Sequence, residues 1–369
     1  MAGEWFRIAN EDEVASPALL VYPERIAENI GRMIALAGGP DRLRPHVKTH
    51  KLPQVVRMLL DRGIGKFKAA TIAEAEMTAA AGGRDVLLAY PAVGPTAGRL
   101  AELVLRFPET RFRALADSDR GVADLAAAAA AKGVTLDVLV DLDVGMHRTG
   151  VAAGPGAAAI YQMIAATPGL APGGLHAYDG HLHDADHDRL AAAATAAFEP
   201  VWRLRDQLLA AGLPVPLVVA SGTPTFPILA RHAGVEVGAG TTVLWDAGQP
   251  QASPDLDFLN AAVLLARVVS RPTPDRLCLD LGHKAVASEM PQPRVRIFGL
   301  EDAVFPGHNE EHLVVETPRA AAYPVGTVLY ALPRHVCPTV ALHAEVVVVE
   351  GGRAIDRWPV AARARRLTV

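Results

Sequence analysis

The feature that most constrains the fold is a repeated alternation between short apolar runs and longer segments with helical spacing. About eight such alternations occupy roughly 235 residues. Their number and order predict an α/β fold, a parallel (β/α)8 TIM-type barrel rather than an open doubly wound sheet. The first strand and helix of the series are expected at 17–22 and 23–36. Further strands are expected at 42–47, 65–70, 85–90, 112–116, 136–142, 173–178, 217–220 and 235–238.

The pattern changes after about residue 250. The later apolar runs are β-rich, carry Gly and Pro between them and show little helical spacing; they fall at 262–269, 277–281, 313–316, 327–331 and 343–349. They predict a C-terminal, mainly β domain. We therefore expect a barrel over residues 16–250 and a β domain over residues 251–369, to which residues 1–15 contribute.

Composition excludes several classes of protein. Apolar residues make up 50% of the 369 residues and the net charge is −4, so the chain is neither disordered nor a typical nucleic-acid-binding protein. Cys278 and Cys337 are too few for a secreted disulfide framework. The N-terminus lacks the basic start of a signal peptide, and no apolar run is long enough for a membrane span. A cytoplasmic location without nucleic-acid or membrane partners is the expectation.

A basic segment at 44–51, with the sequence RPHVKTHK, follows an expected strand. A nucleophilic lysine must lose its proton, and nearby positive charge together with burial lowers the pKa of an ammonium group. A lysine in this segment is therefore a candidate for Schiff-base chemistry. A solvated basic loop is the alternative, but Pro45 favours extended backbone before it and helical spacing follows it.

This segment resembles the cofactor-binding segment of the D-threonine aldolase and D-serine dehydratase family, relatives of the alanine racemases that use pyridoxal 5'-phosphate (PLP). The resemblance implies that Lys48 carries PLP as a Schiff base. The segment DLDVGMHRTG at 141–150 resembles the family's DxGMxRxG pattern, in which the arginine, here Arg148, reaches the cofactor ring. Outside this context, Arg148 could equally be a surface charge.

A segment dense in titratable groups, HAYDGHLHDADH at 176–187, resembles the family's YxGH region. The resemblance places Tyr178 against the cofactor ring and a histidine on its reacting side. His181 and His183 both qualify as the acid/base residue, and the spacing in some aldolases favours His183. Asp184–Asp188 would also suit the first turn of a helix.

Two turns of small residues follow the late strands, SGTPT at 221–225 and GAGTT at 238–242. Backbone N–H groups and hydroxyls in such turns bind phosphate, and phosphate sites are common at this place in parallel barrels. The resemblance assigns the cofactor phosphate to them and places a glutamine near the cofactor. The cofactor-binding candidates are therefore Lys48, Gln54, Arg148, Tyr178, Ser221, Gly222, Thr223, Gly240 and Thr241.

His335 and Cys337 stand two residues apart in PRHVCPT. On an extended segment they would point the same way, and imidazole and thiolate are good zinc ligands. They resemble the family's HxC or HxD metal pair, which implies a divalent ion: zinc first, with manganese or magnesium as alternatives. Asp280–Ala285 and Glu310–His312 also match family segments, and a buried pair of Lys284 with Asp280 would serve structure or catalysis equally.

The resemblance implies a PLP- and metal-dependent lyase acting on D-3-hydroxy amino acids. Aldol cleavage, as in D-threonine aldolase, is slightly favoured over D-serine dehydratase activity, and a D-3-hydroxyaspartate lyase is a further alternative. From another class, the alternative is a non-catalytic PLP-binding protein, although such proteins lack the second domain and the metal pair. A racemase would need a second base, and only Tyr323 and Tyr330 are available in the β domain. A small-molecule D-amino acid substrate and a homodimer are expected.

Overall fold

The computed structural model describes residues 4–369, which form two compact units. The barrel unit comprises Ile30–Lys48, Pro53–Gly240 and Ala364–Val369. The β unit comprises residues 4–29, Thr49–Leu52 and Thr241–Arg363. The two units exchange short segments, so the domain limits at residues 16 and 250 remain predictions.

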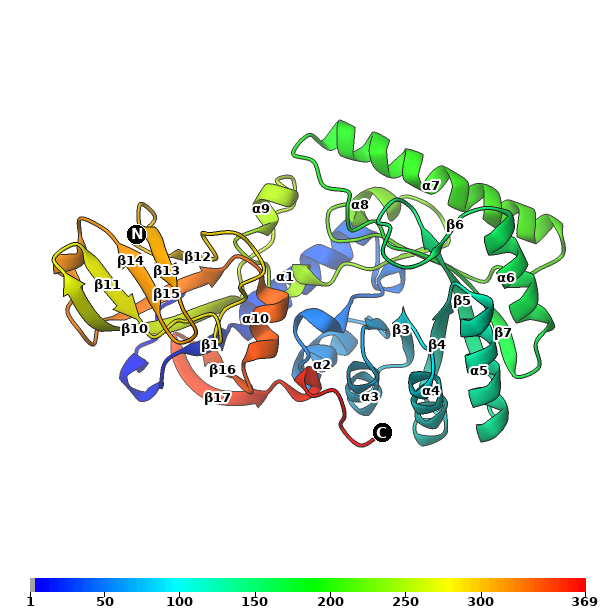
Figure 1. Cartoon of the computed structure of the whole chain (residues 1–369), viewed down its shortest axis with the longest axis horizontal. Coiled ribbons are helices and arrows are strands. Elements are labelled where there is room, and N and C mark those ends of the chain that lie inside the picture. The colour runs from blue at the N-terminus through cyan, green and yellow to red at the C-terminus, as the bar shows by residue number, and fades with distance from the viewer. Residues whose placement is uncertain (1–3) are drawn as a thin grey trace. The chain divides into compact units, whose positions relative to one another are not determined.

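Within residues 4–369, seven parallel strands form the sheet of the barrel unit in the order β2-β3-β4-β5-β7-β8-β9 (Figure 1). The strands are β2 (Lys66–Ala69), β3 (Asp85–Pro91), β4 (Arg111–Ala116), β5 (Leu136–Asp143), β7 (Leu170–Ala177), β8 (Val218–Ala220) and β9 (Val235–Val237), and the short β6 (Val151–Ala152) pairs with the end of β5. The intervening helices are α2 (Pro53–Asp61), α3 (Ile72–Ala80), α4 (Pro95–Arg106), α5 (Asp119–Lys132), α6 (Pro155–Ala166), α7 (His187–Ala210) and α8 (Phe226–Leu229). This alternation confirms the predicted barrel architecture.

The segment 43–46 lies between β9 and β2 and connects the two edges of the sheet. The Arg44 N–H donates to the Val237 carbonyl, and the Lys68 N–H donates to the Pro45 carbonyl, both at 2.9 Å. Only isolated bridges form here, Leu43 with Val237 and His46 with Lys68. A regular strand over 42–47 was expected, but Pro45 has no N–H to donate and a 3-10 turn begins at Val47.

Aliphatic side chains on or next to β3, β4, β5 and β8 fill the barrel. Leu87, Leu115, Leu139, Leu217 and Val219 form one buried cluster. Because alternate residues of a strand face opposite sides, these residues share the inner face while their neighbours pack under the helices. Three helices begin at side-chain caps among the described residues: Thr71 accepts a hydrogen bond from the Glu74 N–H at the start of α3, and Ser118 and Asp186 cap α5 and α7.

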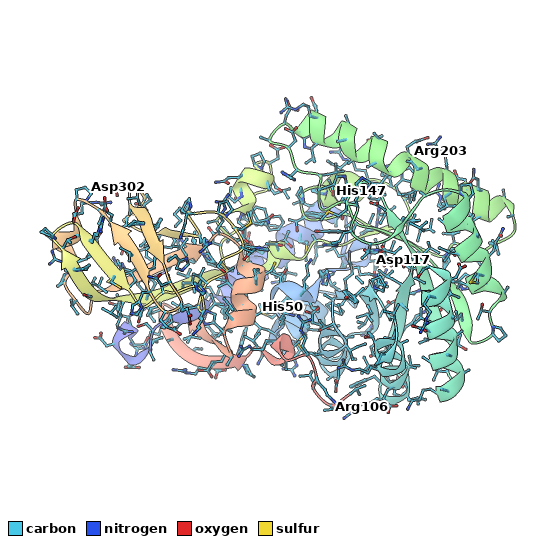
Figure 2. All side chains as sticks on the ribbon, viewed as in Figure 1. His50, Arg106, Asp117, His147, Arg203 and Asp302 are labelled. Carbon is cyan, nitrogen blue, oxygen red and sulfur yellow. The ribbon has the colours of Figure 1, made fainter. Side chains whose placement is uncertain are left out.

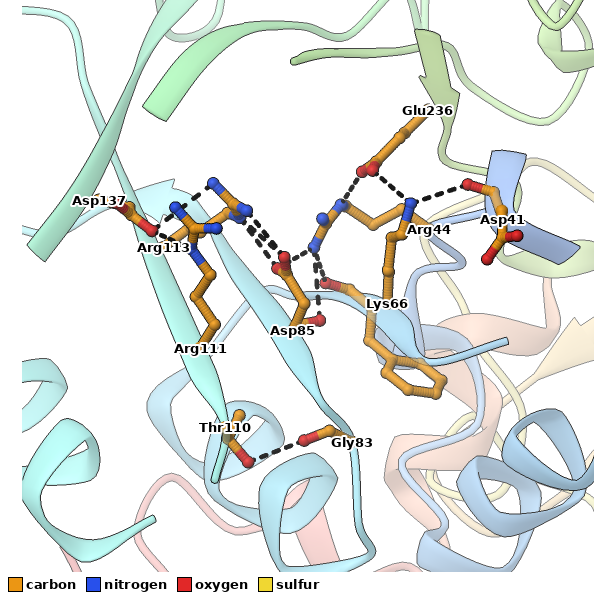
Figure 3. Close-up of polar contacts among 11 residues, drawn as sticks. Asp41, Arg44, Lys66, Gly83, Asp85, Thr110, Arg111, Arg113, Asp137 and Glu236 are labelled. Atoms are coloured by element: carbon orange, nitrogen blue, oxygen red, sulfur yellow. Dashed lines mark hydrogen bonds and ion pairs between the residues drawn. The ribbon is translucent and has the colours of Figure 1, made fainter. Parts of the chain in front are cut away.

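A network of ion pairs holds the amino-terminal ends of the strands together (Figure 3). Arg44 has a fully buried side chain and contacts Asp85 and Glu236, each at 2.6 Å. Arg113 also donates to Asp85, and Lys66 also contacts Glu236. Burial raises the pKa of the Asp85 carboxyl, but Arg44 and Arg113 outweigh it and lower that pKa. The network therefore fixes the segment that leads to Lys48.

The β unit is built on a mixed sheet in the order β13-β14-β11-β10-β1-β16-β17, and β15 joins β10 to β12. Its strands are β1 (Ala18–Val21), β10 (Ala262–Thr273), β11 (Arg276–Leu279), β12 (Val295–Ile297), β13 (Val304–His308), β14 (Leu313–Glu316), β15 (Val328–Pro333), β16 (Glu345–Glu350) and β17 (Arg353–Pro359). It also carries the helices α9 (Gln249–Ala252) and α10 (Val336–Leu342), and α1 (Pro23–Ala37) runs from this unit into the barrel unit. The mainly β second domain is confirmed.

One expectation was wrong. β1, which we expected to open the barrel, pairs antiparallel with β10 and parallel with β16 in the β unit. Its apolar residues pack with Phe6, Val263 and Val347 in the core of that sheet. An apolar run followed by a helix has the same pattern in either sheet, so the sequence did not reveal its partner. Among the described residues, no helix has the length and apolar character that crossing a membrane requires.

Candidate functional site

A cavity of about 400 Å³ opens at the carboxyl ends of the barrel strands. Its polar lining comes from segments far apart in sequence: Lys48 after the 43–46 segment, Lys68 on β2, Asp141 on β5, Arg148 after β5, and His176 and Tyr178 at the end of β7. Functional groups of parallel barrels are placed at this end of the strands. Three predicted cofactor residues, Lys48, Arg148 and Tyr178, thus line one cavity.

Three cationic groups surround the ring of Tyr178. The Nζ atoms of Lys48 and Lys68 lie 5.7 and 5.6 Å from the ring centroid, and the Arg148 guanidinium carbon lies 5.1 Å from it. An aromatic face attracts cations at such distances. Positive charge gathered in a concave site also attracts anionic ligands. The cavity therefore suits an anionic aromatic ligand that a lysine can attack.

The turn after β5 explains the spacing of the residues before Arg148. Asp143 accepts hydrogen bonds from the Gly145 and His147 N–H groups, at 2.9 and 3.0 Å, and its other oxygen contacts the His147 ring. Gly145 has φ +118°, and a Cβ there would lie 2.7 Å from Nε2 of His181. Glycine is therefore required, both for the backbone and for the approach of His181.

A buried pair missed by the sequence analysis, Asp141 and His176, forms one wall of the cavity. His176 Nδ1 lies 2.7 Å from Asp141 Oδ1, and its Nε2 is buried without a hydrogen-bond partner among residues 4–369. Burial and the nearby Lys68 lower the pKa of His176, whereas its hydrogen bond lowers the pKa of Asp141 against the effect of burial. A neutral imidazole that donates to the carboxylate through Nδ1 leaves Nε2 as an acceptor.

Lys68 was also missed. Its side chain is buried at 2% exposure. Burial is the main cause and repulsion from Lys48 the second cause that lower the pKa of Lys68, to about 7. The available signal was a lysine on the inner face of a strand, between Phe67 and Ala69. We had treated that strand only as a structural element.

The small-residue turn at 221–225 is held by Asp179. The Gly222 N–H donates to Asp179 Oδ1 at 2.5 Å, and the Thr225 hydroxyl donates to Asp179 Oδ2 at 2.6 Å. Asp179 is buried, and burial raises its pKa. The Ser221 hydroxyl accepts from the Gly238 N–H at 3.3 Å, and Ser221 itself has φ +76°. The Gly222 N–H, a predicted phosphate donor, thus already has a protein acceptor.

The remaining predicted barrel residues do not line the cavity. His181 packs against Gly145, and its buried Nδ1 has no hydrogen-bond partner in the described part of the chain, whereas His183 is exposed. Gln54 lies on the first turn of α2 with an unpartnered Oε1. Thr223 is half-buried in its turn, and Gly240 approaches His46 so closely that a Cβ would lie 2.9 Å from the His46 carbonyl oxygen.

The predicted metal pair lies in the β unit at the start of α10. His335 is the N-cap residue and Cys337 stands in the first turn, so the extended geometry that we expected for the pair was wrong. The two side chains nevertheless interact. Glu289 Oε1 lies 2.5 Å from His335 Nδ1. Burial lowers the pKa of His335, but Cys337 and Glu289 outweigh it and raise that pKa to about 9.

Two threonines and an aspartate support this segment. The hydroxyls of Thr49 and Thr241 lie 3.2 and 3.8 Å from Cys337 Sγ. The structure thus places Thr241, predicted to contact phosphate, beside the thiol. Asp246 accepts from the Val336 N–H at 2.9 Å and also from Gly248 and Gln249. The backbone between the two candidate ligands is therefore fixed.

The donor set fits an ion with open coordination positions. Among the described residues, no group of three or more His, Cys, Asp or Glu side chains could hold a metal. His335 and Cys337 would supply two ligands, and Glu289 would orient the imidazole through Nδ1, a common arrangement around metals. The pair of Lys284 with Asp280 that we considered does not form among the described residues. Lys284 is exposed and contacts Glu310 at 2.6 Å, and Asp280 accepts a hydrogen bond from Ser16.

The comparisons with known proteins agree with the resemblance seen in the sequence. Residues 21–244 match the family model of the alanine racemase N-terminal domain, and residues 261–349 match that of a putative serine dehydratase domain. A D-threonine aldolase from Arthrobacter sp. is 32% identical, over 95% of this chain and 93% of the relative. A D-threo-3-hydroxyaspartate dehydratase from Delftia sp. is 29% identical, over 93% of this chain and 96% of the relative.

Solved structures extend the match to three dimensions. The crystal structure of D-threonine aldolase from Filomicrobium marinum has a TM-score of 0.88 and 29% identity, over 97% of both chains. The similarity covers both units and the segments that carry the candidate site. The chain therefore belongs to the D-threonine aldolase and D-serine dehydratase family, the two-domain relatives of the alanine racemases.

Proposed function

We propose that the chain is a D-threonine aldolase-like lyase, which cleaves D-3-hydroxy amino acids to glycine and an aldehyde with PLP and a divalent ion. Membership of the family makes it a PLP-dependent lyase that acts on small molecules. Aldol cleavage is favoured because the aldolase relative is slightly more similar than the dehydratase relative.

The observation that carries the proposal is the placement of Lys48 in the barrel cavity beside Tyr178, Lys68 and Arg148. The cavity fits PLP because it joins an amine, an aromatic wall, positive charge and a buried unpartnered nitrogen on His176. When bound, PLP supplies an electron sink for the bond that breaks at the substrate α-carbon. Lys48 would attach it, and Arg148 and Tyr178 would hold its ring.

The cofactor phosphate is proposed to lie at the small-residue turns, at Ser221, Gly222, Thr223, Gly240 and Thr241, with Gln54 nearby. The tight approach of Gly240 to His46 supports a turn built for close contacts. The hydrogen bond of Gly222 to Asp179 makes the Thr223 backbone and hydroxyl the better donors.

Proton transfer is proposed for His181 or His183. The structure favours His181, because it is partly buried, contacts the turn that carries Arg148 and keeps Nδ1 unpartnered. His183 is exposed, next to an Asp184–Arg189 ion pair that begins α7. The sequence spacing pointed toward His183, so the choice needs both variants.

We propose zinc, with manganese or magnesium as alternatives, at His335 and Cys337. A divalent ion held there would supply Lewis-acid polarisation of the substrate hydroxyl. A thiolate ligand favours zinc over the harder ions. The roles of Glu289 and Asp246 are to orient the imidazole and to hold the backbone between the two ligands.

The second candidate function is a D-serine or D-3-hydroxyaspartate dehydratase, which would release ammonia and a keto acid. It is favoured by the similarity to the Delftia dehydratase and by a cysteine rather than an aspartate at position 337. A non-catalytic PLP-binding protein is the alternative outside the enzymes. The homodimer and the cytoplasmic location expected from the sequence remain predictions.

One assay tests these choices. The purified protein is incubated with D-threonine, D-serine and D-3-hydroxyaspartate, with and without chelator, and the products are identified. Glycine with acetaldehyde from D-threonine is the expected result. Keto acid with ammonia would assign the dehydratase, and bound cofactor without turnover would assign the binding protein.

The Lys48→Ala variant should lose the visible absorbance of bound cofactor and at least about a thousand-fold in kcat/KM, since the attachment point is gone. The control is Lys132→Ala, because Lys132 is exposed on α5, where it pairs with Glu102. Full activity in the Lys48→Ala variant would reject the proposed function.

A further inference from the structure

Lys68 lies in the cavity beside the lysine that would carry the cofactor. Its strand, β2, is joined to the segment before Lys48 by the bridge between His46 and Lys68. The side chain runs inward toward the turn after β9, where a Cβ on Gly238 would lie 2.9 Å from Lys68 Nζ. The glycine at 238 therefore leaves room for the Lys68 amine, which lines the same cavity as Lys48.

Unlike Lys66, the Lys68 amine forms no ion pair with a carboxylate among residues 4–369. The groups that act on its charge come from the surrounding strands and turns: Lys48, Arg44, Asp141, Asp179 and His176. Asp141 and Asp179 attract the ammonium, but Asp141 pairs with His176, and Asp179 accepts from Gly222 and Thr225. A buried amine without an acceptor destabilises the empty protein.

Lys66 provides a contrast on the same strand. Its Nζ lies 2.7 Å from Glu236 Oε1 and 2.8 Å from the Asp41 carbonyl oxygen, so its charge is paired at the other end of the barrel. Lys68, by contrast, lines the cavity together with His176, whose buried Nε2 lacks a hydrogen-bond partner among the described residues. Unsatisfied buried polar groups in a native protein call for an explanation, and a bound ligand is a common one.

We propose that Lys68 is a second functional lysine of this site, whose amine binds PLP by charge and hydrogen bonding while Lys48 carries the cofactor covalently. To a lysine that is not attached at its aldehyde, PLP offers acceptors: the phosphate, the phenolate and the unprotonated pyridine nitrogen. The inference rests on the proposed function and deepens it. It makes Lys68 a cofactor-binding residue that favours the deprotonated form of the bound cofactor.

The test compares Lys68→Met with the matched control Lys66→Met in the full-length protein. PLP affinity is measured by absorbance titration of the apoprotein, and the midpoint pH of the bound cofactor's visible spectrum is measured on the loaded protein. Lys68→Met should bind PLP about ten- to a hundred-fold more weakly, as expected for loss of a hydrogen bond from a charged group. Its spectral midpoint should rise by about one pH unit or more, because a nearby positive charge is removed.

Thermal unfolding of the apoprotein separates this role from a structural one. Lys68→Met should raise the apoprotein Tm or leave it unchanged, because the unpaired buried amine is removed. Lys66→Met should lower the Tm and leave PLP affinity and the spectral midpoint unchanged, because the contacts that it breaks, with Glu236 and the Asp41 carbonyl oxygen, lie at the other end of the barrel. The Lys68→Arg variant, which keeps the charge, should have a spectral midpoint close to that of the wild-type protein.

Three outcomes would overturn the inference. They are unchanged affinity and midpoint in Lys68→Met, an unfolded or strongly destabilised Lys68→Met apoprotein, and a borohydride-stable adduct on Lys68 in the wild-type protein. Peptide mass mapping after borohydride reduction distinguishes the two proposals. If the wild-type protein carries the adduct at Lys48 and Lys68→Met has unchanged PLP affinity and spectral midpoint, only the role of Lys68 is rejected. If the wild-type protein carries no adduct at Lys48, both that role and the proposed function are rejected.

Discussion

The cavity of the barrel unit and the His335–Cys337 segment of the β unit are constructed in opposite ways. The cavity draws Lys48, Lys68, Asp141 and Tyr178 from different strand ends, and much of its polar lining is buried. The candidate metal ligands are two residues apart at one helix start, and the His335 side chain is 40% exposed. The first arrangement exists only when the barrel is closed, whereas the second is set by local backbone and a few neighbours.

The difference indicates that the cavity depends on the whole barrel, whereas the His335–Cys337 pair depends on one short segment of the β unit. Charges gathered from many strands affect one another, as the lowered pKa values of Lys68 and His176 show. A local pair supported by Glu289 and Asp246 could lose a bound ion without any change in the barrel residues that are proposed to hold PLP. The two candidate sites should therefore fail separately.

The largest expected effect is on the local pair. Cys337→Ala should lower kcat/KM by at least about a thousand-fold, since metal polarisation contributes several kcal/mol. The visible absorbance of bound PLP should persist, because the barrel residues are unchanged. Metal content measured by atomic spectroscopy should fall, and Cys278→Ala serves as the control with a second half-buried thiol. Loss of PLP from Cys337→Ala would show that the two sites are not independent.

A smaller effect is expected from the ion network at the other end of the barrel. Arg44→Met removes a fully buried guanidinium and leaves Asp85 and Glu236 without one of their partners. Breaking a buried pair in this way costs about 3–5 kcal/mol; the lower end applies here, because Arg113 and Lys66 remain. Urea unfolding measures the loss. Arg120→Met, which breaks an exposed pair with Asp124, should cost less than about 1 kcal/mol.

The third expected effect, comparable in size but limited to acid pH, concerns His50 in the β unit (Figure 2). Burial lowers the pKa of His50 to about 3. The unfolded chain therefore binds more protons between pH 3 and about 6.5, and stability is lost as the pH falls through this range. Between pH 7.5 and 4.5 this histidine alone should cost about 3 kcal/mol.

The check on that value is His50→Asn, whose amide oxygen can accept from the Leu52 N–H as Nδ1 does. Urea unfolding of both proteins at pH 7.5 and 4.5, followed by tryptophan fluorescence, gives the difference in acid sensitivity. Equal loss of stability in the two proteins would mean that His50 is not buried as a neutral imidazole.

The resemblance to the family was enough to identify Lys48, Arg148 and Tyr178 as candidates, because each stands in a short segment that can be recognised from local sequence. Gly145, for example, is needed for the backbone that places Arg148. Lys68 and His176 could not be recognised in this way. Their importance comes from the closure of the barrel, which puts β2 beside the 43–46 segment and gathers their charges in one cavity.

Two expectations failed for identifiable reasons. β1 has the apolar run of a barrel strand, and only its pairing with β10 and β16 assigns it to the other sheet. His335 and Cys337 were expected on an extended strand, but α10 begins between them, and Pro338 is tolerated in a first helical turn. The two side chains do interact, as predicted, but they are brought together by a helix start and not by extended backbone.

The hydrogen bonds of Asp179 have a mechanical consequence. The next residue toward the N-terminus, Tyr178, forms the aromatic wall of the cavity, while Asp179 clamps the turn at Gly222 and Thr225. A Cβ on Gly222 would lie 3.4 Å from Asp179 Oδ1 and 3.5 Å from the Tyr178 ring. A side chain added at 222 would contact both residues, and a hydroxyl lost at 225 would remove one of the two hydrogen bonds that hold Asp179 next to the tyrosine. Residues outside the cavity thus set the angle at which its aromatic wall meets a ligand.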